Sequence, residues 1–208
     1  MASLRRPYPR IIGPEGASCG GNQNWFSSKN FRRCGCGVIA CADTLLYLSG
    51  RQEMNREAYL SYVEGLKKYF PLIPGRGIDG LRLALGMDLL LRREDRGLHA
   101  RWCASGKRFW PRVEELLSAD RPAILSVGPS LPRLWSGETV GLYSRKTDAA
   151  PAERTRAHFL TAIALDGEWV EVSSWGRRLY IRRKELDAYR SGPGAPLLTN
   201  LLYLTDKK

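Results

Sequence analysis

The stretch Arg33–Gly50 reads RCGCGVIACADTLLYLSG and joins a tight glycine turn to an almost wholly apolar segment. Residues 38–48 are apolar on every helical face except at Asp43 and Thr44, and a helix that is apolar all round is a buried helix. Cys36 stands at the helix entrance, where unpaired N–H groups and the positive end of the helix dipole favour a thiolate. The stretch therefore predicts a buried helix with a candidate nucleophile at its start. The alternative is an inert thiol, because free cysteines usually pack as small apolar side chains.

The composition is typical of one globular domain. The chain has 208 residues, of which 43% are hydrophobic and 26% charged, enough for one good core or for one core split into two lobes. No run of about eighteen apolar residues occurs, so we expect no membrane span. Residues 1–20 carry arginines but no apolar core region of a secretory signal, so we expect a cytoplasmic protein.

The cysteines and the charge suggest no further ligand. Five cysteines, an odd number, show no disulfide framework, and the spacing of Cys34, Cys36 and Cys41 is not that of a zinc site. We therefore expect no metal and no cofactor. The net charge of +12 comes mainly from arginine pairs scattered along the chain, which favours a solvated basic surface. No specific nucleic-acid partner is expected, although a basic protein that binds nucleic acid or an anionic surface, with a structural Cys36, is an alternative.

Helical and strand patterns occupy different halves of the chain. Apolar spacing predicts helices over 36–48, 55–70, 79–91 and 111–118, the third with Leu81, Leu85 and Leu89 among its apolar positions. Alternating or continuous apolar runs predict strands over 98–103, 123–127, 158–165, 168–173, 179–182 and 201–204. This separation predicts an α+β fold in a single domain over 1–208. Residues 1–20 would be irregular, 21–120 a mainly helical lobe and 121–208 a mainly antiparallel β lobe.

The second half of the chain holds two further candidate site features. The connection 129–156 is long and poorly patterned, as binding loops often are, and Trp135 and Tyr143 are among the aromatic side chains that could line its pocket. His158 opens the apolar strand 158–165, and an imidazole with a pKa near 7 can take and return a proton. The turn Asp166-Gly167 predicts a hairpin that returns Ser173 to the neighbourhood of His158, where its hydroxyl could orient the ring.

These features in this order resemble the papain-like cysteine peptidases. The resemblance rests on a cysteine at a helix entrance, a histidine opening an apolar strand, and the run Ser173-Ser174-Trp175-Gly176, where that family has Asn-Ser-Trp-Gly. The start Cys36-Gly37-Val38-Ile39-Ala40 is similar to the Cys-Gly-x-x-Ala entrance of the bacterial branch related to double-glycine leader peptidases. The matching stretches, residues 20–50 and 155–186, cover about a third of the chain.

The resemblance implies a papain-like fold, with the nucleophile helix buried between a helical lobe and a β lobe. It implies Cys36 as nucleophile, with Cys34 as the competing candidate, and His158 as general base and then general acid in a thiolate–imidazolium pair. Ser173 would take the place of the family's orienting asparagine. Gln23 would donate to the oxyanion, with Asn30 as the alternative.

Two neighbouring residues are expected to have structural roles. Asp43 would pair with an arginine inside the fold, and Trp175 would shield the contact between His158 and Ser173. The glycine- and proline-bearing segment 1–20 could also cover the cleft.

The sequence thus predicts a thiol hydrolase, a cysteine peptidase or amidase, that acts on a peptide or amide through an acyl-enzyme. The alternative is a papain-fold binding module that has lost efficient catalysis. Departures from the family pattern at Ser173 and Gln23 support this alternative.

Overall fold

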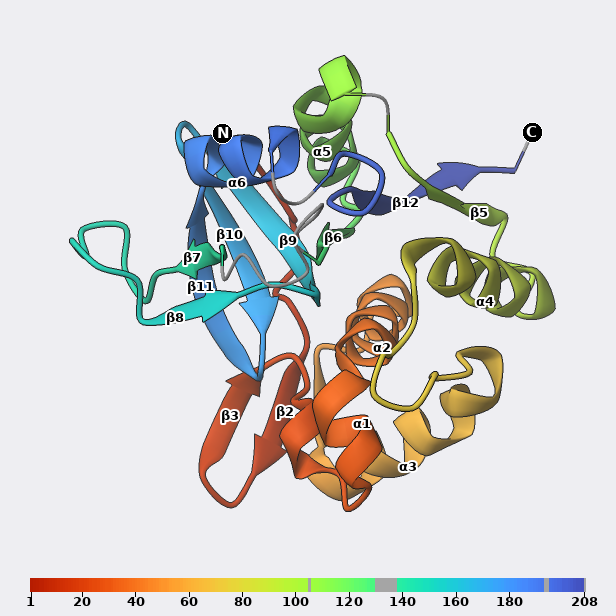
Figure 1. Ribbon diagram of the computed structural model, residues 1–208. Helices are drawn as coiled ribbons and strands as arrows, with labels where there is room; N and C mark the ends of the chain where they lie inside the picture. Colours follow the sequence, from red (N-terminus) through yellow and green to blue (C-terminus); the bar gives the residue numbers. More distant parts are fainter. Residues whose placement is uncertain (105, 130–137, 193–194, 208) are drawn as a thin grey trace.

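A computed structural model describes residues 1–104, 106–129, 138–192 and 195–207 (Figure 1). Its largest feature is a seven-stranded antiparallel sheet, with the strand order β11-β10-β9-β6-β12-β5 and with β1 pairing β9 beside this path. Its strands are β1 (Ala2–Ser3), β5 (Leu98–Trp102), β6 (Ala123–Val127), β9 (His158–Asp166), β10 (Trp169–Ser174), β11 (Arg177–Arg182) and β12 (Leu201–Asp206). Helices and an antiparallel sheet together make the predicted α+β class.

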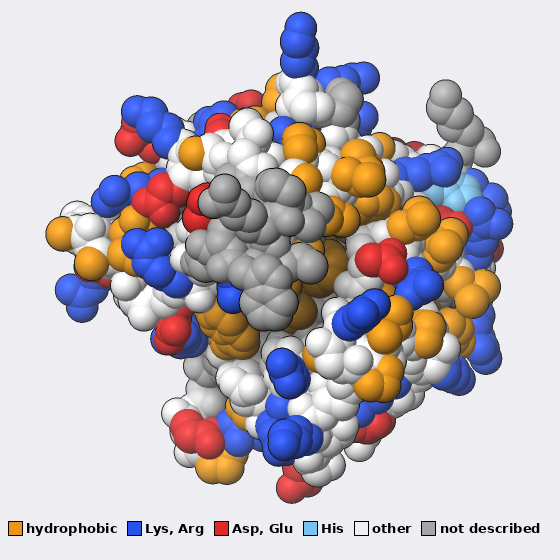
Figure 2. All heavy atoms as spheres, in the orientation of Figure 1, with side chains coloured by type: hydrophobic (Ala, Val, Ile, Leu, Met, Phe, Trp, Pro, Cys, Tyr) orange, Lys and Arg blue, Asp and Glu red, His pale blue; other side chains and the backbone are white. Residues whose placement is uncertain are grey.

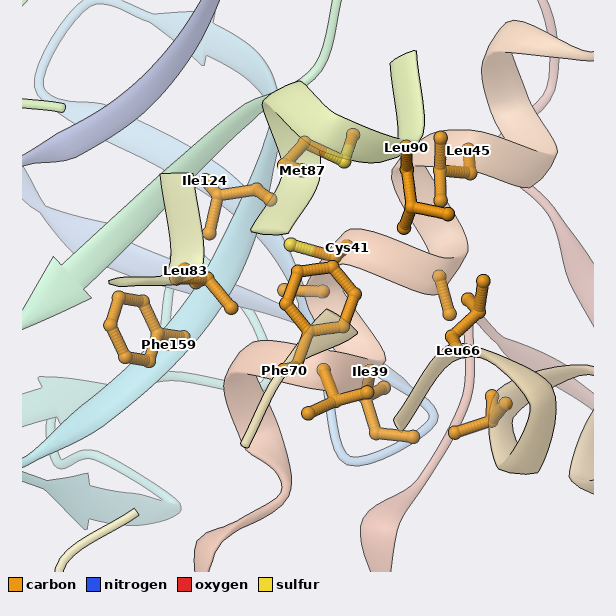
Figure 3. Packing of buried hydrophobic residues seen from close by; sticks show 14 of the residues in the cluster. Ile39, Cys41, Leu45, Leu66, Phe70, Leu83, Met87, Leu90, Ile124 and Phe159 are labelled. Atoms are coloured by element: carbon orange, nitrogen blue, oxygen red, sulfur yellow. The ribbon is translucent and has the colours of Figure 1, made fainter. Parts of the chain in front are cut away.

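One face of this sheet packs against a group of helices, in which α2 (Cys36–Leu48) lies against β9 (Figure 1). The others are α1 (Lys29–Cys34), α3 (Arg56–Leu66) and α4 (Gly80–Arg93), with the short 3₁₀ turns η1 (Gln23–Trp25) and η2 (Lys67–Tyr69). The apolar residues Gly37–Tyr47 of α2 are all buried together with Asp43 and Thr44, as the sequence predicts. Figure 3 shows Ile39, Cys41 and Leu45 of α2 between side chains of α3 and α4 and the sheet residues Ile124 and Phe159.

The other face of the sheet is covered by α5 (Phe109–Ser118) and α6 (Arg183–Ser191) (Figure 1). The two faces are formed by alternate residues of the same strands, because successive side chains in a strand point to opposite sides. Thus Phe159 belongs to the core with α2, whereas Leu160 and Ala162 belong to the core with α5. The 3₁₀ turn η3 (Gly106–Arg108) leads into α5.

The segment 1–20 is not irregular, contrary to the prediction. It forms β1, β2 (Arg10–Gly13) and β3 (Gly16–Cys19), and β2 lies between β3 and β4 (Glu53–Asn55) in a second, three-stranded sheet. β1 pairs with β9, and the backbone N–H of Arg5 donates to Asp120. Short strands of this kind carry little periodicity, so their pairing partners rather than their own sequence decide the structure.

Two further elements differ from the sequence prediction. The helix α6 was not expected, because its segment is strongly charged and only Leu186, Tyr189 and Arg190 are buried. The connection 129–156 contains the hairpin β7 (Val140–Leu142) and β8 (Glu153–Thr155). Residues 130–137, including Trp135, lie outside the described residues. Tyr143 is buried and packs edge-on against Trp169.

Helix α4 buries a different set of residues from the one its leucine spacing suggests. Leu83, Met87, Leu90 and Leu91 pack into the core, whereas Leu81, Leu85 and Leu89 are 58%, 61% and 55% exposed. On the face shown in Figure 2, Lys and Arg side chains are dispersed among acidic and apolar ones. Among the described residues, no helix is both long enough and apolar enough to span a membrane.

Candidate functional site

Cys36 is the first residue of α2 and follows directly on Gly35, which ends α1 and caps α2. The first N–H groups of a helix lack intrahelical acceptors, so the backbone at this position is available to an incoming oxygen. Cys36 is partly exposed, and it lines a pocket of about 10 Å³ together with Gln23, His158 and Trp175. That volume holds about one water molecule. Residues that are far apart in the sequence therefore meet at the start of the buried helix.

The competing candidates lie elsewhere. Cys34 is buried at the end of α1 and is not among the residues that line the pocket. Asn30 accepts a hydrogen bond from the backbone N–H of Gly75 through its Oδ1 atom at 3.2 Å and does not line the pocket either. Gln23 does line it, and its Nε2 atom donates to the carbonyl of Arg32 at 2.7 Å. Cys36 rather than Cys34, and Gln23 rather than Asn30, therefore line the pocket.

His158 is the first residue of β9 and is buried. Its Nε2 atom lies 2.7 Å from the hydroxyl of Ser174. The indole of Trp175 stacks on the imidazole, with ring centroids 4.4 Å apart and an interplanar angle of 22°. Trp175 therefore shields His158 as predicted, but the contact it covers is the one with Ser174.

The predicted contact between Ser173 and His158 is wrong. The hydroxyl of Ser173 donates to the carbonyl of Cys19 at 2.8 Å. Ser173 also lines the pocket, but it lies opposite Thr161 in the β9–β10 pairing, three residues along from His158, so strand alternation points its hydroxyl away from the imidazole. Ser174 is on the same face as His158. The hairpin signal placed the right segment beside His158, but counting the alternation from the Asp166-Gly167 turn selects Ser173. The β-bulge between Glu171 and Val172 shifts the register by one residue and brings Ser174 to that face instead.

The protonation states of the two central residues differ from the implied ion pair. Burial raises the pKa of Cys36 to about 11, and the backbone N–H groups of Phe159 and Gly37 only partly offset this rise. Burial also lowers the pKa of His158 to about 3. Both shifts favour the uncharged form, because a charge is poorly solvated inside the protein. At neutral pH the site therefore holds a neutral thiol and a neutral imidazole.

Asp43 lies on the same face of α2 as Cys36 and also lines the pocket. The predicted pairing with an arginine is wrong. Its carboxylate accepts the backbone N–H of Gly21, at 2.9 and 3.1 Å from the two oxygens, and the hydroxyl of Tyr59 at 2.7 Å. Burial raises the pKa of Asp43 to about 7, and the bonds from Tyr59 and Gly21 work against that rise. Tyr59 gave no signal in the sequence, where it reads as one apolar position of a helix.

The pocket is lined by residues from 21 onward, so no residue of the segment 1–20 is among them. Within the described parts of the chain, no group of three or more His, Cys, Asp and Glu residues is placed to hold a metal ion. A scan against protein-family models finds no match to the chain, and a search of curated proteins finds no similar sequence. Functional inference therefore depends on the geometry of the pocket and on the resemblance of its motifs.

Proposed function

We propose that this protein is a papain-like thiol hydrolase that cleaves a peptide or amide bond through an acyl-enzyme. The observation that carries the proposal is the meeting of Cys36, His158 and Gln23 around one pocket. The proposed papain-like arrangement would have a nucleophile on a buried helix and a base at the end of a strand of an antiparallel sheet, and the positions of α2 and β9 support it. The substrate class, the absence of a specific nucleic-acid partner and the cytoplasmic location stay predictions.

The reaction would begin from the neutral pair. We assign His158 the tautomer in which Nε2–H donates to the Ser174 hydroxyl, 2.7 Å away. Nδ1 then carries the lone pair and would accept the thiol proton as the Cys36 sulfur attacks the carbonyl carbon. The carbonyl oxygen becomes an oxyanion, for which the Nε2 group of Gln23 and the backbone N–H of Cys36 are the donors. When the carbon–nitrogen bond breaks, the imidazolium returns the proton to the amine. Water then hydrolyses the thioester, with His158 as the base.

Ser174 and Trp175 would keep the imidazole in one orientation and one tautomer. The serine hydroxyl fixes Nε2, and the stacked indole limits rotation of the ring and keeps water from its face. In this proposal Ser174 replaces Ser173 as the orienting residue. A serine in this place is neutral, which agrees with an imidazole that burial holds uncharged.

A binding module that has lost catalysis is the second candidate function. The observation that favours it is the small volume of the pocket: it holds about one water molecule, and burial keeps the thiol and the imidazole neutral. A neutral thiol attacks slowly unless its proton is removed during the reaction. The two functions differ in whether His158 accelerates acylation of Cys36.

The test uses p-nitrophenyl acetate, an activated acyl donor whose small acetyl group suits a narrow pocket. We expect a burst of p-nitrophenol, an acetyl group on Cys36 by peptide mass spectrometry, and its later loss by hydrolysis. Replacing His158 by alanine should slow acetylation of Cys36 about 100-fold or more, because general-base catalysis typically contributes about 10²–10⁴-fold. Replacing Gln23 by alanine should slow it about 10- to 100-fold, within the range of an oxyanion donor or somewhat below.

Cys34→Ala is the matched control, because Cys34 is a nearby buried thiol outside the pocket. We expect it to leave the burst unchanged, whereas Cys36→Ala should abolish the burst. If the acetylation rate of Cys36 is unchanged in both the His158 and the Gln23 variants, the proposed hydrolase function is refuted. The protein would then be assigned to the binding-module alternative.

A further inference from the structure

The buried carboxylate of Asp43 has no role in the mechanism proposed above. Asp43 is 2% exposed and follows Cys36 by seven residues, two turns along one face of α2 and about 10 Å from it. Among the described residues, no Lys, Arg or His forms an ion pair with it. A buried charge without an ion-pair partner is costly unless hydrogen bonds compensate it. The hydrogen bonds that Asp43 accepts must therefore offset this cost.

The donors of those hydrogen bonds are a backbone N–H in a loop and a tyrosine hydroxyl, not a positively charged side chain. Both oxygens of Asp43 receive the backbone N–H of Gly21, at 2.9 and 3.1 Å, and Tyr59 of α3 donates its hydroxyl to one of them. Above about pH 7, where this carboxyl is ionised, its hydrogen bonds are about twice as strong as those to a neutral acceptor. Through Asp43, the helix that carries Cys36 therefore binds the backbone of the loop that follows β3, at Gly21.

The loop is pressed so closely against Asp43 that it tolerates no side chain. A Cβ atom on Gly20 would overlap the Asp43 carboxylate and the Ser173 hydroxyl, and one on Gly21 would overlap the ring of Tyr59. Gly20 also has a φ of +70°, in the left-handed region that favours glycine. The two glycines thus adapt the chain to the carboxylate.

The loop residues Gly20 and Gly21 are followed almost at once by Gln23. Asn22 caps the 3₁₀ turn η1 by accepting the N–H of Asn24, and Gln23 is the first residue of that turn. Only one residue separates Gly21 from Gln23, so the position of the Gly21 backbone constrains where the Gln23 side chain starts, while the carbonyl of Arg32 holds its Nε2 atom. Displacements of about 1 Å at a catalytic group cost up to about 100-fold in rate.

We propose that Asp43 is a positioning residue that holds Gln23 beside Cys36 by binding the backbone N–H of Gly21. The proposal rests on the thiol-hydrolase function argued above. It separates two tasks on one face of α2: Cys36 attacks, and Asp43 fixes the loop that stabilises the resulting oxyanion. Neither the charge nor the proton of Asp43 enters the reaction.

The test measures acetylation of Cys36 by p-nitrophenyl acetate in a double-mutant cycle of Asp43→Asn and Gln23→Ala. Asparagine keeps the shape but replaces the carboxylate with a weaker, neutral acceptor. We expect Asp43→Asn to slow acetylation about 3- to 10-fold when Gln23 is present and to have no further effect in the Gln23→Ala background, because residues that act through one another are not additive. Equal slowing in both backgrounds would overturn the proposal in favour of a general structural role.

Two controls keep the result interpretable. Tyr59→Phe removes the other hydrogen bond to Asp43 but leaves the one from Gly21, so it should change acetylation less than about threefold. Nuclear magnetic resonance gives a readout that needs no activity: the Gly21 amide proton should move upfield in Asp43→Asn but not in Tyr59→Phe. If the chemical shift of the Gly21 amide proton is the same in wild type and in Asp43→Asn, the proposed hydrogen bond from Gly21 to Asp43 is refuted. Failure of wild-type acetylation with a responsive Gly21 would instead refute the hydrolase.

Discussion

The buried carboxylate of Asp43 predicts a specific dependence of stability on pH. Burial raises its pKa from 3.8 to about 7, so the folded state holds this proton more tightly than the unfolded chain does. The contribution of Asp43 to the free energy of unfolding is therefore highest below about pH 4 and falls as the pH rises from about 4 to about 7. Above about pH 7 it does not change further. A shift of this size corresponds to roughly 4 kcal/mol of unfolding free energy, because each pKa unit is worth about 1.4 kcal/mol.

The variant Asp43→Asn isolates this effect, since asparagine does not titrate. Urea unfolding of the wild type and of Asp43→Asn, each at about pH 4, 5.5, 7 and 8.5, gives the difference in unfolding free energy. We expect the variant to gain roughly 4 kcal/mol on the wild type between the lowest and the highest pH, most of it below about pH 7. His158 contributes the opposite trend, because its lowered pKa makes stability fall as the pH drops below about 6.5. That trend is common to both proteins and cancels in the difference.

The other titratable side chains near Asp43 do not interfere. Burial raises the pKa of each above its ordinary value, so each stays neutral up to about pH 8.5; they are Tyr8, Cys19, Cys41, Tyr59 and Tyr62. A change of less than about 1 kcal/mol across the same range for Asp43→Asn would refute the reasoning that burial dominates at this site.

Three further predictions concern the site and the core. Iodoacetamide should label Cys36 at a rate that rises about tenfold per pH unit above neutrality, since burial raises its pKa to about 11, and a plateau below about pH 8 would show a preformed ion pair instead. Leu83→Ala should lower the unfolding free energy by about 2–5 kcal/mol in urea titrations, whereas Leu85→Ala, on the exposed face of the same helix, should change it by less than about 0.5 kcal/mol. Gly20→Ala should lower the thermal unfolding midpoint, because the left-handed backbone alone costs about 1–2 kcal/mol and the added methyl group overlaps a buried carboxylate; an unchanged midpoint would contradict this.

Regular periodicity accounts for the parts of the fold that the sequence predicts well. The apolar run after Cys36 and the apolar strand after His158 are long enough for burial to dominate their structure, and the structure confirms both elements and their buried faces. The leucines of α4 show the limit of this reasoning. Two leucine rows share that helix, and only the packing partners decide that Leu83 faces the core and Leu85 faces solvent.

The candidate site was predictable at the level of segments but not of every contact. The signals at Cys36 and His158 are local, and both residues line the pocket. The choice between Ser173 and Ser174 depends on strand register, and a shift of one residue reverses the face. The partner of Asp43 is a backbone N–H, and every residue except proline carries one, so residue types alone give no signal for it.

The segment Cys19–Gln23 connects the two halves of the site. On the side of His158, the backbone N–H of Cys19 donates to the carbonyl of Gly176, and the Asn22 amide donates to the carbonyl of Trp175. On the side of Cys36, the carboxylate of α2 binds the backbone N–H in the middle of the same segment. Because one short segment is bonded both to α2 and to the turn between β10 and β11 beside His158, moving the nucleophile helix away from that turn would break these bonds. The position of this loop therefore adds to the direct packing of α2 against β9, where the backbone N–H of Phe159 also bonds the Cys36 sulfur, in setting the geometry of the proposed pair.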